Sequence, residues 1–373
     1  MIVEAEPLDV LRTRTSEKWT SYPADVLPLF VAEMDYPLAP PVVDALVSVV
    51  RANDIGYVGS ISRLATSFAG FASSRLGWTL DPSRVRTTTD VSVAIVESLR
   101  AAISPGSSVV ITPPIYPPFF DLVPEAGGVV VEVPLVTGGL DIDGIGRAFA
   151  AGARAILISN PHNPLGLVHS QDSLAALADL AARYDAIVVS DEIHAPLTHR
   201  PGTFRPFHEV NDNAREYGIV VTSASKAFNL AGAKCAILVA ASDRTLALLD
   251  AMPEEVAFRT SQLGLHASIA AFDHGGEWLD GAITAIRASS DLLASLLLPG
   301  MSYVPPDASY LAWLDFRELG WGDDPAARAL EAGVAINSGL TFGAQGAGFA
   351  RLNLACGPSV LTEALRRLSA VRV

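Results

Sequence analysis

Lysine is scarce in this chain of 373 residues, which contains only Lys18, Lys226 and Lys234. The rest of its 26 lysine and arginine residues are arginines, so lysine is not the residue that usually supplies positive charge on the surface. Arginine stays protonated, whereas a lysine amine can lose its proton and attack a carbonyl carbon. Two of the three lysines lie within residues 222–236. This stretch is therefore the first candidate for covalent catalysis, and a solvated loop lysine is the alternative interpretation.

Basic clusters and long apolar runs are also missing. The net charge is −14 and no run of lysine or arginine occurs, which argues against nucleic acid as a partner because phosphate backbones require a clustered basic face. Every apolar run is interrupted well before the ~20 residues that a transmembrane helix requires, so no membrane partner is expected. The amino terminus carries Glu4 and Glu6 instead of a basic region before an apolar stretch, so it does not resemble a signal peptide. We expect a cytoplasmic protein.

Cysteine is limited to Cys235 and Cys356. Two cysteines are too few for a disulfide framework, and no cysteine and histidine cluster has the spacing of metal ligands. Both are predicted to be reduced and buried, and no metal site is expected. With 50% hydrophobic residues, a chain of this length can bury a large core and is predicted to form two domains.

Short β-branched runs alternate with helix-like segments in the middle of the chain. The predicted strands cover residues 109–112, 129–133, 155–159, 187–190, 219–222 and 236–239. Their nearly continuous apolar character suits strands that are covered on both faces. Helices are predicted over residues 41–53, 91–103 and 171–184, the last capped by Ser170. The pattern predicts an α/β fold with a mainly parallel, mixed sheet covered by helices.

The domain prediction uses both ends of the chain. Residues 1–40 are irregular and rich in proline, and they are expected to contribute to the small domain. Residues 41–276 are predicted to form the large domain, residues 277–299 a linking helix, and residues 300–373 a smaller α+β domain. Within the last segment, strands are predicted over 310–316 and 349–354, and helices over 325–331 and 361–368.

Polar side chains follow three of the predicted strands. Asn163 follows the run that ends at Ser159, Asp191 ends the next run, and Lys226 comes shortly after the third. Ligands bind beyond the carboxyl ends of strands in such sheets. A lysine, a carboxylate and phosphate-binding hydroxyls together suit pyridoxal phosphate, which needs an amine, an acid beside its ring nitrogen and donors for its phosphate.

Several motifs in order carry a family resemblance. They are Asn160-Pro161-His162-Asn163-Pro164-Leu165-Gly166, Ser190-Asp191-Glu192-Ile193-His194, Ser223-Ala224-Ser225-Lys226-Ala227-Phe228-Asn229-Leu230-Ala231-Gly232 and Phe349-Ala350-Arg351-Leu352-Asn353-Leu354-Ala355-Cys356. Their order resembles the fold-type I pyridoxal-phosphate enzymes of the class I/II aminotransferase superfamily. Within it, Val31-Ala32-Glu33-Met34-Asp35-Tyr36-Pro37, Pro113-Pro114-Ile115-Tyr116-Pro117-Pro118-Phe119 and the Asp-Glu-Ile-His form resemble the PatB/MalY-type C-S lyases, which are cystathionine β-lyases.

The resemblance implies a role for each matching residue. Lys226 would be the Schiff-base lysine and the acid and base at the α-proton. Asp191 would pair with the ring nitrogen, Asn163 would contact the ring hydroxyl and the substrate, and Tyr116 would stack on the ring. Arg351 would clamp the substrate carboxylate through two parallel hydrogen bonds.

The resemblance also implies a phosphate site and a shared dimer. The phosphate would be held by the side chains of Ser223, Ser225 and Lys234 and by the backbone of Val91 and Ser92, where a helix begins. Tyr57 would reach the phosphate and substrate of the neighbouring subunit, so a homodimer with shared sites is implied.

Four positions depart from the superfamily pattern. His194 stands where many aminotransferases have a tyrosine, and this difference argues against ordinary transamination. His194 is predicted to be one of the cofactor-binding residues. Lys234 replaces a common arginine, so that contact would be a point charge. Asp90 replaces the usual glycine, which is unfavourable beside a phosphate unless the side chain turns away or caps the helix. Ala227 replaces a threonine.

The implied reaction is α,β-elimination from an L-cysteine-type thioether, which gives a thiol, pyruvate and ammonia. Cystathionine is the substrate that the resemblance suggests, and other cysteine S-conjugates are allowed by the same chemistry. An aminotransferase, which shares the deprotonation step, remains the alternative. A regulatory protein built on the same fold is a third interpretation, against which stand the acidic charge and the lack of an added DNA-binding segment.

Overall fold

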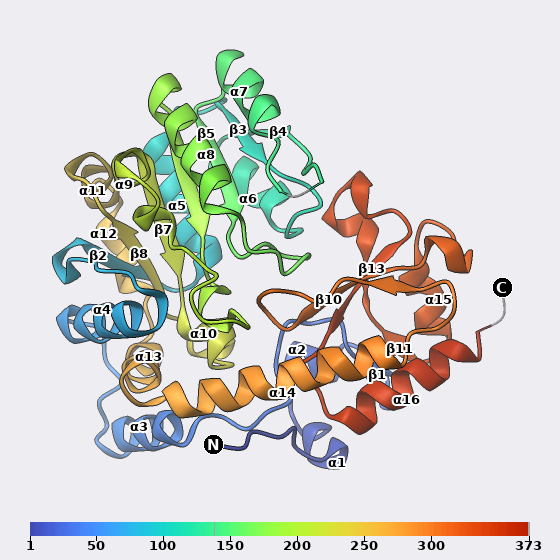
Figure 1. Cartoon of the computed structure of the whole chain (residues 1–373). Helices are drawn as coiled ribbons and strands as arrows, with labels where there is room; N and C mark the ends of the chain where they lie inside the picture. Colours follow the sequence, from blue (N-terminus) through green and yellow to red (C-terminus); the bar gives the residue numbers. More distant parts are fainter. Residues whose placement is uncertain (138, 372–373) are drawn as a thin grey trace.

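A seven-stranded mixed sheet forms the centre of the larger part of the molecule (Figure 1). The computed structural model describes residues 1–137 and 139–371. In the order β2-β8-β7-β6-β5-β3-β4, the strands are β2 (Val85–Thr88), β8 (Ala236–Ala240), β7 (Gly218–Thr222), β6 (Ile187–Asp191), β5 (Ala155–Ser159), β3 (Ser108–Ile111) and β4 (Val129–Glu132). Neighbours are parallel except at β8, which is antiparallel to both β2 and β7. The predicted fold class is confirmed.

Helices cover both faces of this sheet. The side chains alternate along each strand, so Val188 and Val220 enter one apolar core while Val189 and Val221 enter the other. The second core is closed by α5 (Val91–Ala102), α6 (Phe119–Glu125) and α11 (Asp243–Asp250). The first is closed by α4 (Ser62–Leu76), α7 (Ile142–Ala150), α8 (Gln171–Tyr184) and α13 (Gln262–His274), among others. Burial on both faces explains the nearly continuous apolar runs of the central strands.

One predicted strand departs from that pattern. The run at residues 129–133 was expected to be covered on both faces, but β4 is the outermost strand of the sheet and Val129 is 52% exposed. That expectation was wrong, since an apolar run alone does not distinguish an edge strand from a central one. The strand β2 was not predicted, because its sequence Val-Arg-Thr-Thr lacks a continuous apolar run.

A smaller four-stranded antiparallel sheet lies beside the large one (Figure 1). Its order is β12 (Asn337–Ser338), β13 (Phe349–Asn353), β10 (Leu311–Asp315) and β9 (Ser302–Tyr303). The helices α15 (Pro325–Glu331) and α16 (Pro358–Ser369) complete this part, and the long helix α14 (Gly276–Ser295) runs along both parts. The final two residues of the predicted segment 300–373 lie outside the described residues.

The amino-terminal segment packs against elements from the far end of the chain. Its strand β1 (Leu27–Pro28) pairs in parallel with β11 (Val334–Ala335). The short helices of the remaining chain are α1 (Leu8–Leu11), α2 (Glu17–Thr20), α3 (Pro40–Arg51), α9 (Asp212–Tyr217), α10 (Ala224–Ala227) and α12 (Glu254–Phe258). None of the helices in the described part of the chain has both the length and the apolar character needed to cross a membrane.

Residues 30–34, which we call the strap, run between the two sheets. Each of their five consecutive carbonyl oxygens accepts a hydrogen bond from a side chain. The donors are Arg351 to Phe30, Asn353 to Val31 and Glu33, Lys226 and Tyr310 to Ala32, Lys18 to Glu33, and Asn229 and Arg14 to Met34. The strap is thus fixed by side chains from both parts of the molecule.

Candidate active site

A cavity of about 220 Å³ lies at the carboxyl ends of β5 and β6 and at the start of α5. Nine of the candidate residues line it: Val91, Ser92, Tyr116, Asn163, Asp191, His194, Ser225, Lys226 and Lys234. The remaining wall is formed by Ala32, Asp90, Ile95, Ser159, Ile193 and Ala231. Residues more than 190 positions apart in the sequence therefore meet at one point, as the strand-end rule predicts for this type of sheet.

The helix α10 presents the amine of Lys226 to this cavity. The Ser223 hydroxyl caps α10 by accepting a hydrogen bond from the Ser225 backbone N–H (3.1 Å). Lys226 Nζ donates to the carbonyl oxygen of Ala32 (3.0 Å). Burial, reinforced by the positive charge of Arg351, lowers the pKa of Lys226 to about 8. About a tenth of these amines is therefore uncharged and nucleophilic at pH 7, far more than for an ordinary lysine.

Asp191 ends β6 and is buried at the floor of the cavity. One carboxylate oxygen accepts a hydrogen bond from the Ile193 backbone N–H (3.1 Å). Burial raises the pKa of Asp191 to about 7, against the opposing effects of that hydrogen bond and of Lys226. A carboxyl group in this state would be stabilised as an anion by a positive ring nitrogen placed next to it.

Arg351 and Asn163 are joined directly. Arg351, on β13, donates from Nη1 to Asn163 Oδ1 (3.0 Å) and from Nη2 to the Phe30 carbonyl (3.1 Å). Its guanidinium lies over the ring of Phe342, and burial lowers the pKa of Arg351 to about 10, so it remains a cation at neutral pH. A buried cation in this position can attract a carboxylate.

Asp90 acts as a helix cap next to Lys234. Its Oδ1 accepts from the Val93 backbone N–H at the start of α5 (3.0 Å), and its Oδ2 pairs with Lys234 Nζ (3.0 Å). From the sequence, we expect Asp90 either to turn away from the phosphate site or to cap the helix. The structure shows the second arrangement, since the carboxylate caps α5. Lys234 has φ +62°, a backbone conformation that is uncommon for a residue other than glycine.

Three candidate residues are not among those that line the cavity: Arg351, which reaches it through Asn163, and Ser223 and Tyr57. The Ser223 hydroxyl is buried and donates to the Cys235 carbonyl (2.6 Å), so its position is explained by the cap and this bond. Tyr57 is 89% exposed on the surface of the chain. Phosphate binding by Ser223 and contact of Tyr57 with a neighbouring subunit therefore remain predictions.

Other nearby residues gave no clear sequence signal. Tyr310, from the residue before β10, donates its hydroxyl to the Ala32 carbonyl (2.9 Å) and packs edge-on against His194, with ring centroids 6.1 Å apart. Burial lowers the pKa of His194 to about 3, so its ring is neutral. Ala32 belongs to a motif that was recognised, but its contribution is a backbone carbonyl, which the residue type does not predict.

The chemistry of these walls fits pyridoxal phosphate. The cavity holds a lysine whose amine is partly uncharged, a buried carboxyl at its floor, and a second cation beside the start of α5. A helix start and a lysine suit an anion, and the buried carboxyl suits a pyridine nitrogen.

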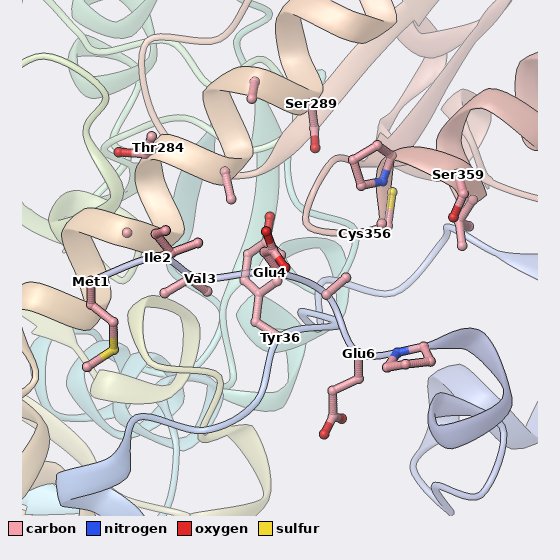
Figure 2. A pocket seen from close by; sticks show the side chains of 18 of the residues that line it. Met1, Ile2, Val3, Glu4, Glu6, Tyr36, Thr284, Ser289, Cys356 and Ser359 are labelled. Atoms are coloured by element: carbon pink, nitrogen blue, oxygen red, sulfur yellow. The ribbon is translucent and has the colours of Figure 1, made fainter.

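A larger cavity of about 680 Å³ lies elsewhere, between the amino terminus and α14 (Figure 2). Met1, Val3 and Tyr36 approach it from one side, and Ser289 of α14 and Cys356 from the other. None of the candidate residues lines it. Size alone therefore does not identify the active site of this molecule.

Comparison with known proteins agrees with the geometry. The profile of the aminotransferase class I and II family matches residues 30–368. Cystathionine beta-lyase from Corynebacterium glutamicum is 36% identical, with 98% of each chain covered. Cystathionine beta-lyase PatB from Bacillus subtilis is 30% identical, covering 93% of this chain and 92% of the relative. The crystal structure of cystalysin from Treponema denticola, which contains pyridoxal 5'-phosphate, superposes with a TM-score of 0.90 at 26% identity and 96% coverage of both chains. Because the family profile covers most of the chain and the two cystathionine beta-lyase relatives are at least 30% identical over nearly its whole length, this chain belongs to the aminotransferase class I and II family.

Proposed function

We propose that this protein is a pyridoxal-phosphate-dependent carbon-sulfur β-lyase. Its substrate would be an L-cysteine thioether, with cystathionine as the first compound to test. One substrate molecule and one water would give a thiol, pyruvate and ammonia, and the bond between Cβ and sulfur would break. The cystathionine β-lyase relatives support this assignment.

The cofactor would be held by residues of α10, β6 and α5 and of the loops between elements. Lys226 would bond its carbonyl carbon, Asp191 would face its ring nitrogen, and Ser225, Lys234 and the start of α5 would hold its phosphate. Asn163 would contact the ring hydroxyl, and Tyr116 and His194 would border the ring. When bound, pyridoxal phosphate withdraws electrons from the substrate, which acidifies the α-proton and allows a group to leave from Cβ.

The residues of the chain would then bind the substrate and move one proton. Arg351 would attract the α-carboxylate and exchange its contact with the Phe30 carbonyl for the substrate. The amine of Lys226, which is partly uncharged near neutral pH, would accept the α-proton. The anion of Asp191 would stabilise positive charge at the ring nitrogen. The neutral ring of His194 would border the cavity without adding charge.

A single observation carries the proposal: a lysine amine of lowered pKa shares a small cavity with a buried carboxyl group, next to a buried arginine. An ordinary surface lysine would keep a normal pKa and would have no such neighbours.

The test is an incubation of the purified holoenzyme with cystathionine in the absence of any keto acid. We expect pyruvate and thiol in equal amounts, and borohydride reduction should leave the cofactor attached to the peptide that contains Lys226. A Lys226→Ala variant should lose both results, while Arg366→Ala, which removes an exposed cation paired with Glu363 on α16, is the control. Turnover that requires a keto acid, with no thiol released, would instead identify an aminotransferase.

We further propose that the protein is a cytoplasmic homodimer with shared sites. The helix α3 exposes Val43, Val47 and Val50, which lie on one face at helical spacing, and the exposed Tyr57 follows it. An apolar face of this kind beside an exposed tyrosine suits a subunit interface.

The domain division is also kept as a proposal. Residues 1–40 and 300–373 would form the small domain, residues 41–276 the large one, and residues 277–299 the link. The pairing of β1 with β11 and the length of α14 support it.

A further inference from the structure

One backbone oxygen serves two side chains at the centre of the candidate site. The Ala32 carbonyl accepts a hydrogen bond from Lys226 Nζ (3.0 Å) and another from the Tyr310 hydroxyl (2.9 Å). A carbonyl oxygen has two lone pairs, so both are engaged. The two donors come from different parts of the chain, since Lys226 belongs to α10 and Tyr310 precedes β10.

The position of this carbonyl is fixed on both sides along the chain. Asn353 donates to the carbonyls of Val31 (2.7 Å) and Glu33 (2.6 Å), which flank Ala32. Asn229, three residues after Lys226, donates to the Met34 carbonyl and accepts from the Met34 N–H, both at 2.9 Å. The strap cannot rotate the Ala32 oxygen away without breaking several of these bonds.

Tyr310 is a permanent donor to that oxygen. Its side chain is fully buried, and burial raises the pKa of the phenol far above neutral, so the hydroxyl keeps its proton. The aromatic contact with His194 holds the ring in place. The neighbouring His194 is neutral, so it contributes no competing charge.

We propose that Tyr310 is a positioning residue for the catalytic lysine, acting through the Ala32 carbonyl. It fixes the oxygen that accepts the hydrogen bond from Lys226 and, by donating to the same oxygen, makes that oxygen a weaker acceptor for the ammonium form. This inference rests on the proposed function, because it assigns Tyr310 a part in preparing Lys226 for the cofactor and for the α-proton.

The arrangement favours the uncharged amine. An ammonium group has three hydrogens to donate, whereas here the shared oxygen offers it a single lone pair. Poorly satisfied donors disfavour the charged form. Without the phenol, the Ala32 oxygen accepts more strongly from the amine and the amine has greater freedom to move, and both changes favour the ammonium form.

The experiment measures amine reactivity in the cofactor-free protein, residue by residue. A chain with three lysines can be treated with a small acylating reagent at a series of pH values, and the extent of modification of each lysine follows from peptide mass spectrometry. In the wild type, Lys226 should react with a midpoint near pH 8. In Tyr310→Phe we expect the midpoint to rise and the reactivity of Lys226 at pH 8 to fall about three- to tenfold, the range that one hydrogen bond supports.

The other two lysines and a second tyrosine provide the controls. Lys18 is fully buried and paired with Asp35, so it should stay unreactive as long as the protein is folded. Lys234 is half-exposed and should react equally in both proteins. Tyr303→Phe removes a hydroxyl that bonds Ser290 (2.8 Å), away from the strap, and it should leave the profile of Lys226 unchanged.

The outcomes separate this inference from the proposed function. If the wild type attaches the cofactor to Lys226 but Tyr310→Phe has the wild-type reactivity profile, or a lower midpoint, the role of Tyr310 is refuted. If the wild type does not attach the cofactor, the proposed function fails. If Lys18 becomes reactive in Tyr310→Phe, the variant is not properly folded and the wild type is examined instead. In selectively ¹³C-labelled wild-type protein, we expect a nuclear Overhauser effect between the Lys226 ε-methylene and the Tyr310 ring. The absence of this effect overturns the proposal.

Discussion

Asp90 divides its carboxylate between a helix terminus and a cation. One oxygen caps α5 through Val93, and the other pairs with Lys234. Any phosphate that binds here must compete with Asp90 for Lys234. The carboxylate of Asp90 is therefore expected to weaken the binding of a phosphate to Lys234.

Asp90→Asn should strengthen cofactor binding. The amide oxygen can still cap α5, but the negative charge that competes for Lys234 is gone. Because the pair is partly exposed, we expect the Kd for pyridoxal phosphate to fall only about two- to fivefold, as measured by fluorescence titration.

Asp243→Asn is the matched control, since Asp243 forms an exposed pair with Arg84 on a different surface. The interpretation of Asp90 as a competitor would be abandoned if its variant bound the cofactor with unchanged or lower affinity.

Site residues that belong to a recognisable sequence motif could be identified from the sequence. A residue that contributes by bonding to a backbone carbonyl could not. Lys226, Asp191 and Asn163 follow predicted strands, so the strand-end rule brought them together correctly. Tyr310 gave no signal because its partner is a carbonyl oxygen, a group that every residue has. Ser223 matched its motif, yet its hydroxyl is engaged with the Cys235 carbonyl.

At the scale of elements, the strap depends on one asparagine more than on any other side chain of β13. Asn353 is fully buried, donates to two carbonyls of the strap and accepts from the Ala355 N–H (2.7 Å). Its loss would leave one buried backbone N–H and two partly buried carbonyls without this partner.

Asn353→Ala should therefore lower the free energy of unfolding by about 2–4 kcal/mol, measured by urea denaturation. The strap should also become more sensitive to limited proteolysis. Asn337→Ala, on the neighbouring strand β12 and half-buried, should have a much smaller effect. Equal losses in the two variants would contradict the anchoring role.

Most central elements could be predicted because their patterns are local. The helix capped by Ser170 was predicted over residues 171–184 and is observed there, with the cap bond from Ser173 N–H to Ser170 Oγ at 3.1 Å. The antiparallel direction of β8 and the edge position of β4 could not be derived, because both depend on neighbours that are distant in the sequence. The helices α4 and α13 were not predicted, and in α13 the buried residues lie around most of the helix, so that they form no single apolar stripe.

At the scale of the whole molecule, buried histidines link stability to pH. The pKa of His208 is lowered to about 4 by burial, and its Nε2–H donates to the Gly218 carbonyl (3.0 Å). An unfolded histidine has a pKa of about 6.5. Because the folded pKa is the lower one, the unfolded state takes up a proton first, and the stabilising contribution of His208, present above pH 6.5, is lost as the pH falls toward 4.

His208→Phe should flatten the pH dependence of the free energy of unfolding between pH 6.5 and 4. One proton corresponds to about 1.4 kcal/mol per pH unit. Chemical denaturation at several pH values measures this slope, with His274→Phe, at an exposed position, as the control. A slope identical to that of the wild type would exclude His208 as a contributor.

The proposed dimer makes a separate prediction at this scale. Val47→Asp places a charge in the middle of the exposed apolar face of α3, between Val43 and Val50. If this face is a subunit interface, the variant should sediment as a monomer, because an unpaired buried charge is costly. Asp44→Asn, on the same helix, should leave the assembly intact. A wild type that is itself monomeric would refute the proposed dimer.

The strap also determines when the site can form during synthesis. Its residues emerge early, but the hydrogen bonds from Arg351 and Asn353 span 321 and 322 positions. Contacts of such separation cannot form until nearly the whole chain has left the ribosome, since translation proceeds from the amino terminus. The acceptor of Lys226 therefore stays unfixed through most of translation. A truncated chain that lacks β13 could build much of the large sheet, but it would not hold its amine in place, so the site is completed only when the polypeptide is nearly complete.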